Sequence, residues 1–113
     1  MTKPPATSCP RPARTSDGAI DVPSLENVTR HLLDGGVTGL FVNGSSGEVT
    51  HLTNDERDTV LTTIAGVNAG QVPVLAGAVE QTTNRVLEET RRAGSLGHDG
   101  ICATPQYVPL QNP

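Results

Sequence analysis

Aromatic residues are nearly absent from this chain of 113 residues, and their scarcity limits the kind of core that it can build. They make up 2% of the composition, as Phe41 and Tyr107, and tryptophan is missing. Large aromatic side chains usually supply much of the buried apolar area of a small independent domain. A core must therefore come from aliphatic residues, within an apolar content of 35%.

Basic residues are too few to support nucleic-acid binding. The formal net charge is −4, and the eight lysine and arginine residues form no basic patch. Binding to a phosphate backbone depends on a concentration of positive charge on one surface. We therefore expect no nucleic-acid partner.

Long apolar runs and paired cysteines are missing as well. No segment approaches the roughly 20 apolar residues of a membrane span, and the N-terminus shows no hydrophobic signal-peptide core. Cys9 and Cys102 form no Cys-x-x-Cys pair, and the histidines, which we expect in loops or on the surface, lack metal-ligand spacing. We expect a cytoplasmic protein with free thiols, no membrane partner and no metal or other cofactor.

The apolar pattern predicts helices that alternate with buried parallel strands. Asp21 is suited to cap a helix that has Pro23 in its first turn. Thr53 and Glu56 have the spacing of a capping box for a second helix. Such an alternation indicates an α/β fold with right-handed βαβ units, in either a barrel or an open sheet. The expected strands cover residues 39–42, 72–76 and 100–103, and the expected helices begin near residues 21, 53 and 83.

The N-terminal segment has a different composition. Residues 1–16 contain four prolines among threonine, serine and arginine, so they offer few backbone donors and little apolar surface. We expect a poorly ordered tail over 1–16 and one partial domain over 17–113. A first strand within the tail is in doubt.

Charged side chains are concentrated on the second and third predicted helices. We interpret the acidic members as solvated helix faces, although Glu89 occupies a position that should pack on the sheet. Arginines on the same helices can pair with them for a few tenths of a kcal/mol each. The acidic residues are Asp55, Glu56, Asp58, Glu88 and Glu89.

The run Asn43-Gly44-Ser45-Ser46-Gly47-Glu48 follows the first of the predicted inner strands and is the strongest candidate for a site. Small residues that carry hydroxyls between glycines expose backbone N–H groups, which can bind a carboxylate or phosphate. The same residues are common in plain turns. The pattern alone leaves both interpretations open.

A series of short segments from about residue 17 onwards resembles the dihydrodipicolinate synthase / N-acetylneuraminate lyase family, in order and in spacing. The segments are Asp17-Gly18-Ala19-Ile20-Asp21, Gly35-Gly36-Val37-Thr38-Gly39-Leu40, Gly44-Ser45-Ser46-Gly47-Glu48, Leu52-Thr53-Asn54-Asp55-Glu56-Arg57, Val72-Pro73-Val74-Leu75-Ala76-Gly77, Gln81-Thr82-Thr83, Gly97-His98-Asp99-Gly100 and Ala103-Thr104-Pro105-Gln106-Tyr107.

This resemblance implies a (β/α)8 TIM barrel, of which the chain would supply about three β-α units and the fourth strand. Such barrels typically need about 250 residues. The family joins pyruvate, or a similar 2-oxo acid, to an aldehyde through a lysine Schiff base, as class I aldolases and lyases do, and its members form homo-oligomers. Pyruvate or a related 2-oxo acid is therefore the expected ligand.

The resemblance also implies roles for particular residues. Ser45 matches a hydroxyl of the family's proton relay, and Ser45, Ser46 and Gly47 match the substrate-binding site, in which Ser46 and its N–H match the position that binds the pyruvate carboxylate. Tyr107 matches a relay tyrosine that reaches across a subunit interface in the family. Two serines in the loop match neither of the common subgroups, and Gln106 replaces a frequent tyrosine, so the substrate class stays open.

The Schiff-base lysine has no counterpart in these residues. The only lysine is Lys3, in the proline-rich segment, whereas imine formation needs an amine that burial keeps neutral. We therefore expect an N-terminal fragment of a Schiff-base lyase that is inactive alone. The alternative is a stand-alone, non-catalytic half-barrel that binds small carboxylates or a protein partner.

Overall fold

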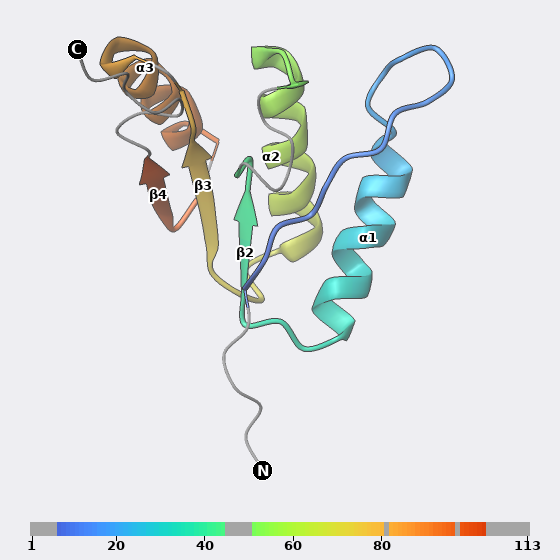
Figure 1. Ribbon diagram of the computed structural model, residues 1–113. Helices are drawn as coiled ribbons and strands as arrows, with labels where there is room; N and C mark the ends of the chain where they lie inside the picture. Colours follow the sequence, from blue (N-terminus) through green and yellow to red (C-terminus); the bar gives the residue numbers. More distant parts are fainter. Residues whose placement is uncertain (1–6, 45–50, 81, 97, 104–113) are drawn as a thin grey trace, which may run out of the picture.

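The computed structural model describes residues 7–44, 51–80, 82–96 and 98–103, in which parallel strands alternate with helices (Figure 1). The sheet has the order β1-β2-β3-β4, and every neighbouring pair is parallel. The predicted array of βαβ units is confirmed. In chain order the elements are β1 (Thr7–Ser8), α1 (Val22–Asp34), β2 (Gly39–Val42), α2 (Asn54–Asn68), β3 (Val74–Ala78), α3 (Thr83–Gly94) and β4 (Gly100–Ala103).

The helices begin where local side chains satisfy their first N–H groups. The Asp21 carboxylate accepts a hydrogen bond from the Ser24 N–H at 3.1 Å, and Pro23 lies in the first turn of α1. At α2 the Thr53 hydroxyl accepts from the Glu56 N–H, and the Glu56 carboxylate accepts from the Thr53 N–H at 2.9 Å. Both predicted caps are confirmed, because capping depends only on residues within one turn.

The core lies between the sheet and the helices. Alternate residues of the inner strands point to the helices, and the packed helix residues come mainly from α1 and α2, which lie side by side in Figure 1. All of them are aliphatic, as the lack of aromatic residues requires. The buried cluster contains Leu25, Leu40, Val42, Leu52, Val60, Leu61, Ile64, Val74, Ala76 and Ala93.

The opposite face of the sheet carries apolar residues that are only partly buried and that no described helix covers. Phe41 and Leu75 are register partners on this face, and Leu75 is 38% exposed. Cys102 of β4 is also exposed. This uncovered face is the one that would line the inside of a closed barrel. No helix in the described part has the length and apolar content that crossing a bilayer requires.

The third strand begins two residues later than predicted. Val72 stays outside it because the Asn68 side chain occupies both backbone groups of Val72, donating to its oxygen at 2.8 Å and accepting from its N–H at 3.1 Å. Pro73 then follows without an N–H to donate. The strand starts at Val74 and extends to Ala78.

The first strand, which the sequence left in doubt, is present over two residues. Thr7 and Ser8 pair with Gly39 and Leu40 of β2. Further along, the Arg14 guanidinium contacts the Glu56 carboxylate at the start of α2. These contacts connect residues 7–14 to the sheet and helices, and the division of the chain at residue 16 stays a prediction.

The contact between Arg14 and Glu56 should be visible in an acid titration. The hydrogen bond from Arg14, followed by the one from the Thr53 backbone, lowers the pKa of Glu56 to about 2. Because this pKa is depressed, the associated stabilisation is complete above the ordinary range of glutamate and is lost as the pH falls towards 2. We expect the variant Arg14→Gln to raise the pKa of Glu56 towards its usual value in an NMR titration of the side-chain carboxyl.

A suitable control is Arg30→Gln, which removes the same charge from an exposed position on α1. It should leave the Glu56 titration unchanged. An ordinary glutamate titration in the unmodified chain would contradict the pairing.

Candidate functional site

The predicted site residues Ser45, Ser46, Gly47 and Tyr107 all lie outside the described residues, so their roles stay predictions. The structure does describe the positions from which their two segments start. One segment begins after Gly44, two residues beyond the end of β2 at Val42, and the other begins directly after Ala103, the last residue of β4. Both starting points are carboxyl ends of parallel strands, the edge of a β/α sheet where ligands usually bind.

Asn43 fixes the end of β2. Its backbone has a φ of 60°, in the left-handed region that asparagine tolerates better than most residues. The residue is 4% exposed, and its side chain donates through Nδ2 to the carbonyl oxygen of Arg57 in α2 at 3.1 Å. The other side-chain atom, Oδ1, is buried and has no hydrogen-bond partner among the described residues.

Two glycines at this end of the sheet make close contacts, Gly77 with the backbone of Asn43 and Gly44 with the Phe41 side chain. A Cβ on Gly77 would overlap the carbonyl oxygen of Asn43 and lie 2.9 Å from its carbonyl carbon. A Cβ on Gly44 would lie 2.7 Å from the ring of Phe41. The chain directly after β2 is therefore packed against β3 at Asn43 and against the Phe41 ring at Gly44.

A cluster of six charged residues lies between α2, α3 and the end of β3. Its central cation is Arg57, whose side chain is 6% exposed. Arg57 donates to Glu80 and lies 3.5 Å from the Glu89 carboxylate. The members of this charge cluster are Arg57, Asp58, Glu80, Arg85, Glu89 and Arg92.

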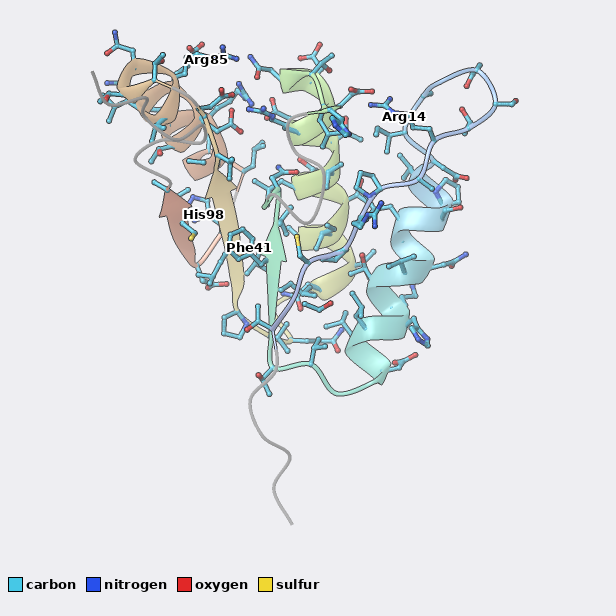
Figure 2. The ribbon with its side chains drawn as sticks, in the orientation of Figure 1. Arg14, Phe41, Arg85 and His98 are labelled. Atoms are coloured by element: carbon cyan, nitrogen blue, oxygen red, sulfur yellow. The ribbon has the colours of Figure 1, made fainter. Side chains whose placement is uncertain are left out.

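Two further arginines balance the carboxylates of the charge cluster. Arg92 contacts Glu89 at 2.6 Å and Asp58 at 2.8 Å. Arg85, labelled on α3 in Figure 2, lies 3.2 Å from Glu80, but its side chain is 61% exposed and solvent weakens the pair. The six charges sum to zero, so the cluster holds α2, α3 and the end of β3 together without a net buried charge.

The expectation that the acidic residues form solvated faces is wrong for Glu89, which is 5% exposed. Burial raises the pKa of its carboxyl, and the nearby Arg92 and Arg57 partly offset that rise. The cluster also includes Glu80 and Arg57, for which the sequence pattern alone predicts no burial. The sequence does contain a signal for Glu80, because it is a charged residue directly after a continuous apolar run.

The histidines are expected in loops or on the surface, and all three fit this expectation, with His98 in the loop before β4. His31 and His51 are exposed, whereas both ring nitrogens of His98 are buried and have no partner among the described residues. Figure 2 shows His98 on the segment that leads into β4. Within the described ranges, no group of three or more His, Cys, Asp or Glu residues could hold a metal ion.

Comparison with protein families gives a match over nearly the whole chain. The profile of the Dihydrodipicolinate synthetase family matches residues 10–113. A 4-hydroxy-tetrahydrodipicolinate synthase from Xanthomonas axonopodis pv. citri is 44% identical over 93 residues, which are 81% of this chain and 31% of that protein. An uncharacterized DapA-like lyase from Halobacterium salinarum is 36% identical over 96 residues, 84% of this chain and 32% of that protein.

Solved structures give the same result. Dihydrodipicolinate synthase from Thermotoga maritima aligns with a TM-score of 0.80 and 27% identity, over 88% of this chain and 34% of that one. CdNal from Clostridium difficile, solved in complex with mannosamine, aligns with a TM-score of 0.84 and 26% identity, over 94% of this chain and 37% of that one. The strands and helices match the N-terminal part of TIM-barrel structures, which confirms the predicted fold class. The chain spans about a third of the length of these relatives.

Proposed function

The chain belongs to the dihydrodipicolinate synthetase family, and from this membership we propose that it supplies the 2-oxo-acid site of a Schiff-base aldolase or lyase. The ligand is pyruvate or a related 2-oxo acid. The observation that carries the proposal is the family match over residues 10–113, which includes both segments at the carboxyl ends of the strands.

The proposed roles follow the order of the chemistry. The N–H groups of Ser46 and Gly47 and the hydroxyl of Ser46 bind the carboxylate, as small residues between glycines can. The hydroxyls of Ser45 and Tyr107 pass protons, because imine formation and collapse need several proton transfers. The contacts of Asn43 and Gly77 support these roles, because they fix the end of β2, and the segment with the two serines follows it in the chain.

The uncovered face of the sheet supports a larger assembly. Phe41 and Leu75 would be covered by further strands of a barrel, and the relatives are about three times as long as this chain. We propose that the imine lysine comes from outside these 113 residues, and that the whole enzyme is a cytoplasmic homo-oligomer. Without that lysine the chain is a carboxylate-binding part that does not catalyse the reaction alone.

The carboxylate site can be tested by titrating the chain with pyruvate and following backbone amides by NMR. We expect saturating shifts of the amides from Ser45 to Glu48, with a millimolar dissociation constant that corresponds to about −4 kcal/mol. The variant Ser46→Ala should weaken binding, whereas Ser16→Ala, an exposed serine near the N-terminus, should not. Absent or uniform shifts would mean that this segment is a plain turn.

The missing amine can be tested by reductive trapping. After incubation with pyruvate and borohydride, intact mass should show no specific adduct, because Lys3 is the only lysine and lies near the N-terminus. Any low-level adduct should disappear in Lys3→Arg with a blocked N-terminal amine. A stoichiometric adduct that persists in that variant would contradict the proposal.

A further inference from the structure

Arg14 connects three parts of the chain through one guanidinium group. Its Nη1 donates to the carbonyl oxygen of Gly18 at 2.7 Å and to the Glu56 carboxylate at 2.6 Å. Its Nη2 donates to the carbonyl oxygen of His51 at 3.0 Å and to the Glu56 carboxylate at 3.2 Å. Figure 2 shows Arg14 near the start of α2, at the end of the molecule to which β2 and β3 point. The side chain therefore links the turn before α1 to the residues that lead into α2.

The backbone around Arg14 is held by its own hydrogen bonds. Arg14 forms an antiparallel bridge with Ile20, and the Thr15 N–H donates to the carbonyl oxygen of Ala19 at 2.8 Å. Gly18 has a φ of 89°, which glycine adopts without strain. Ile20 packs against the core. The guanidinium is thus carried by a fixed turn, which lowers the entropic cost of its contacts.

His51 directly follows the segment 45–50, which contains the proposed carboxylate-binding residues. Before this segment, Asn43 is held against β3 and α2. After it, Arg14 bonds the carbonyl oxygen of His51, and the next residue, Leu52, is buried in the core. The chain is therefore restrained on both sides of 45–50. A short segment with restrained ends has fewer conformations to lose when it orders around a ligand.

This arrangement requires the shape of a guanidinium as well as its charge. Arginine presents five N–H donors in a planar fork, whereas the lysine ammonium acts as a compact point charge. The ion pair with Glu56 contributes little to stability by itself, since the Arg14 side chain is 38% exposed. Replacing Arg14 should therefore leave the fold intact and act locally, at His51.

We propose that Arg14 is a positioning residue of the 2-oxo-acid site. Its hydrogen bond to the carbonyl oxygen of His51 restrains the segment 45–50 in the conformation that binds the carboxylate. Arg14 acts through the backbone of His51 and does not touch the ligand. This role rests on the proposed function, because it assigns Arg14 to the same site.

The variants Arg14→Lys and Arg14→Gln separate the fork from its charge. Lysine can still pair with Glu56, but it cannot bond Glu56 and His51 together as the planar fork does. In pyruvate titrations followed by NMR, we expect both variants to have a dissociation constant about threefold to tenfold above that of the unmodified chain. The pKa of Glu56 should stay low in Arg14→Lys and rise in Arg14→Gln. Arg30→Gln, which removes an exposed positive charge from α1, should leave the pyruvate affinity unchanged.

Amide hydrogen exchange tests the restraint without any ligand. The amides of residues 45–50 should exchange faster in both Arg14 variants, while the amide of Leu61, buried within α2, keeps its rate. Unchanged exchange over 45–50 would overturn the proposal, and so would a native pyruvate affinity in Arg14→Lys, which would mean that charge alone is required. If the unmodified chain does not bind pyruvate, the proposed function fails, and the exchange rates still decide whether Arg14 restrains the segment.

Discussion

Replacing Arg57 by methionine should lower the free energy of unfolding by about 3 kcal/mol, the low end of the range for breaking a buried ion pair. The substitution leaves the carboxylates of Glu80 and Glu89 buried without their central cation. Arg92 still contacts Glu89, which is why the low end applies. Urea denaturation followed by circular dichroism measures the change.

The double variant Arg57→Met with Glu80→Leu should recover most of this loss. Apolar residues of similar volume often replace a buried ion pair at little cost, to within about 1 kcal/mol. Arg85→Met is the matched control, because Arg85 also pairs with Glu80 but is largely exposed, and its loss should cost less than about 1 kcal/mol. Equal effects of Arg57→Met and Arg85→Met would show that the buried position of Arg57 has no energetic importance.

Replacing Gly77 by alanine should destabilise the chain by about 3 kcal/mol or prevent folding, at the upper end of the range for overpacked sites. The added Cβ would overlap the carbonyl oxygen of Asn43, and backbone atoms cannot move aside as a flexible side chain can. The effect should extend to the proposed carboxylate site, since the same contact fixes the end of β2. Thermal unfolding and the pyruvate titration would measure the two consequences.

Gly66 provides the opposite case with the same chemical change. It lies within α2, a Cβ on it would meet nothing within 4 Å, and its φ is not positive. Gly66→Ala should therefore stabilise the chain by roughly 0.5–1 kcal/mol, through helix propensity. If Gly77→Ala were as well tolerated as Gly66→Ala, the close contact between β2 and β3 would be disproved.

The sequence predicts well those features that depend on neighbouring residues. Asp21 and the pair Thr53 and Glu56 mark the starts of α1 and α2 because a cap needs only one turn of chain. The start of β3 was misplaced, because the decisive hydrogen bonds come from the Asn68 side chain, and a run of apolar residues gives no sign of them.

Features that depend on distant residues could not be predicted in the same way. Glu89 is buried because Arg57 from a different helix lies against it, and no local pattern shows that contact. The Nε2 of His98 likewise lies 3.9 Å from the position that a Cβ on Gly94 of α3 would take, and the residues around His98 give no sign of this contact. The proposed roles of Ser45, Ser46, Gly47 and Tyr107 rest on the family resemblance, and they await the titrations above.

The order of strands in the sheet repeats their order along the chain, and this has a consequence for synthesis on the ribosome. Each strand pairs with the one made immediately before it, with a single helical crossover between them. Loop closure is therefore short at every step, and no strand has to wait for a distant partner. A nascent chain can add one strand and one helix at a time as it leaves the ribosome, so that β2 and β3 can associate before β4 is available to pair.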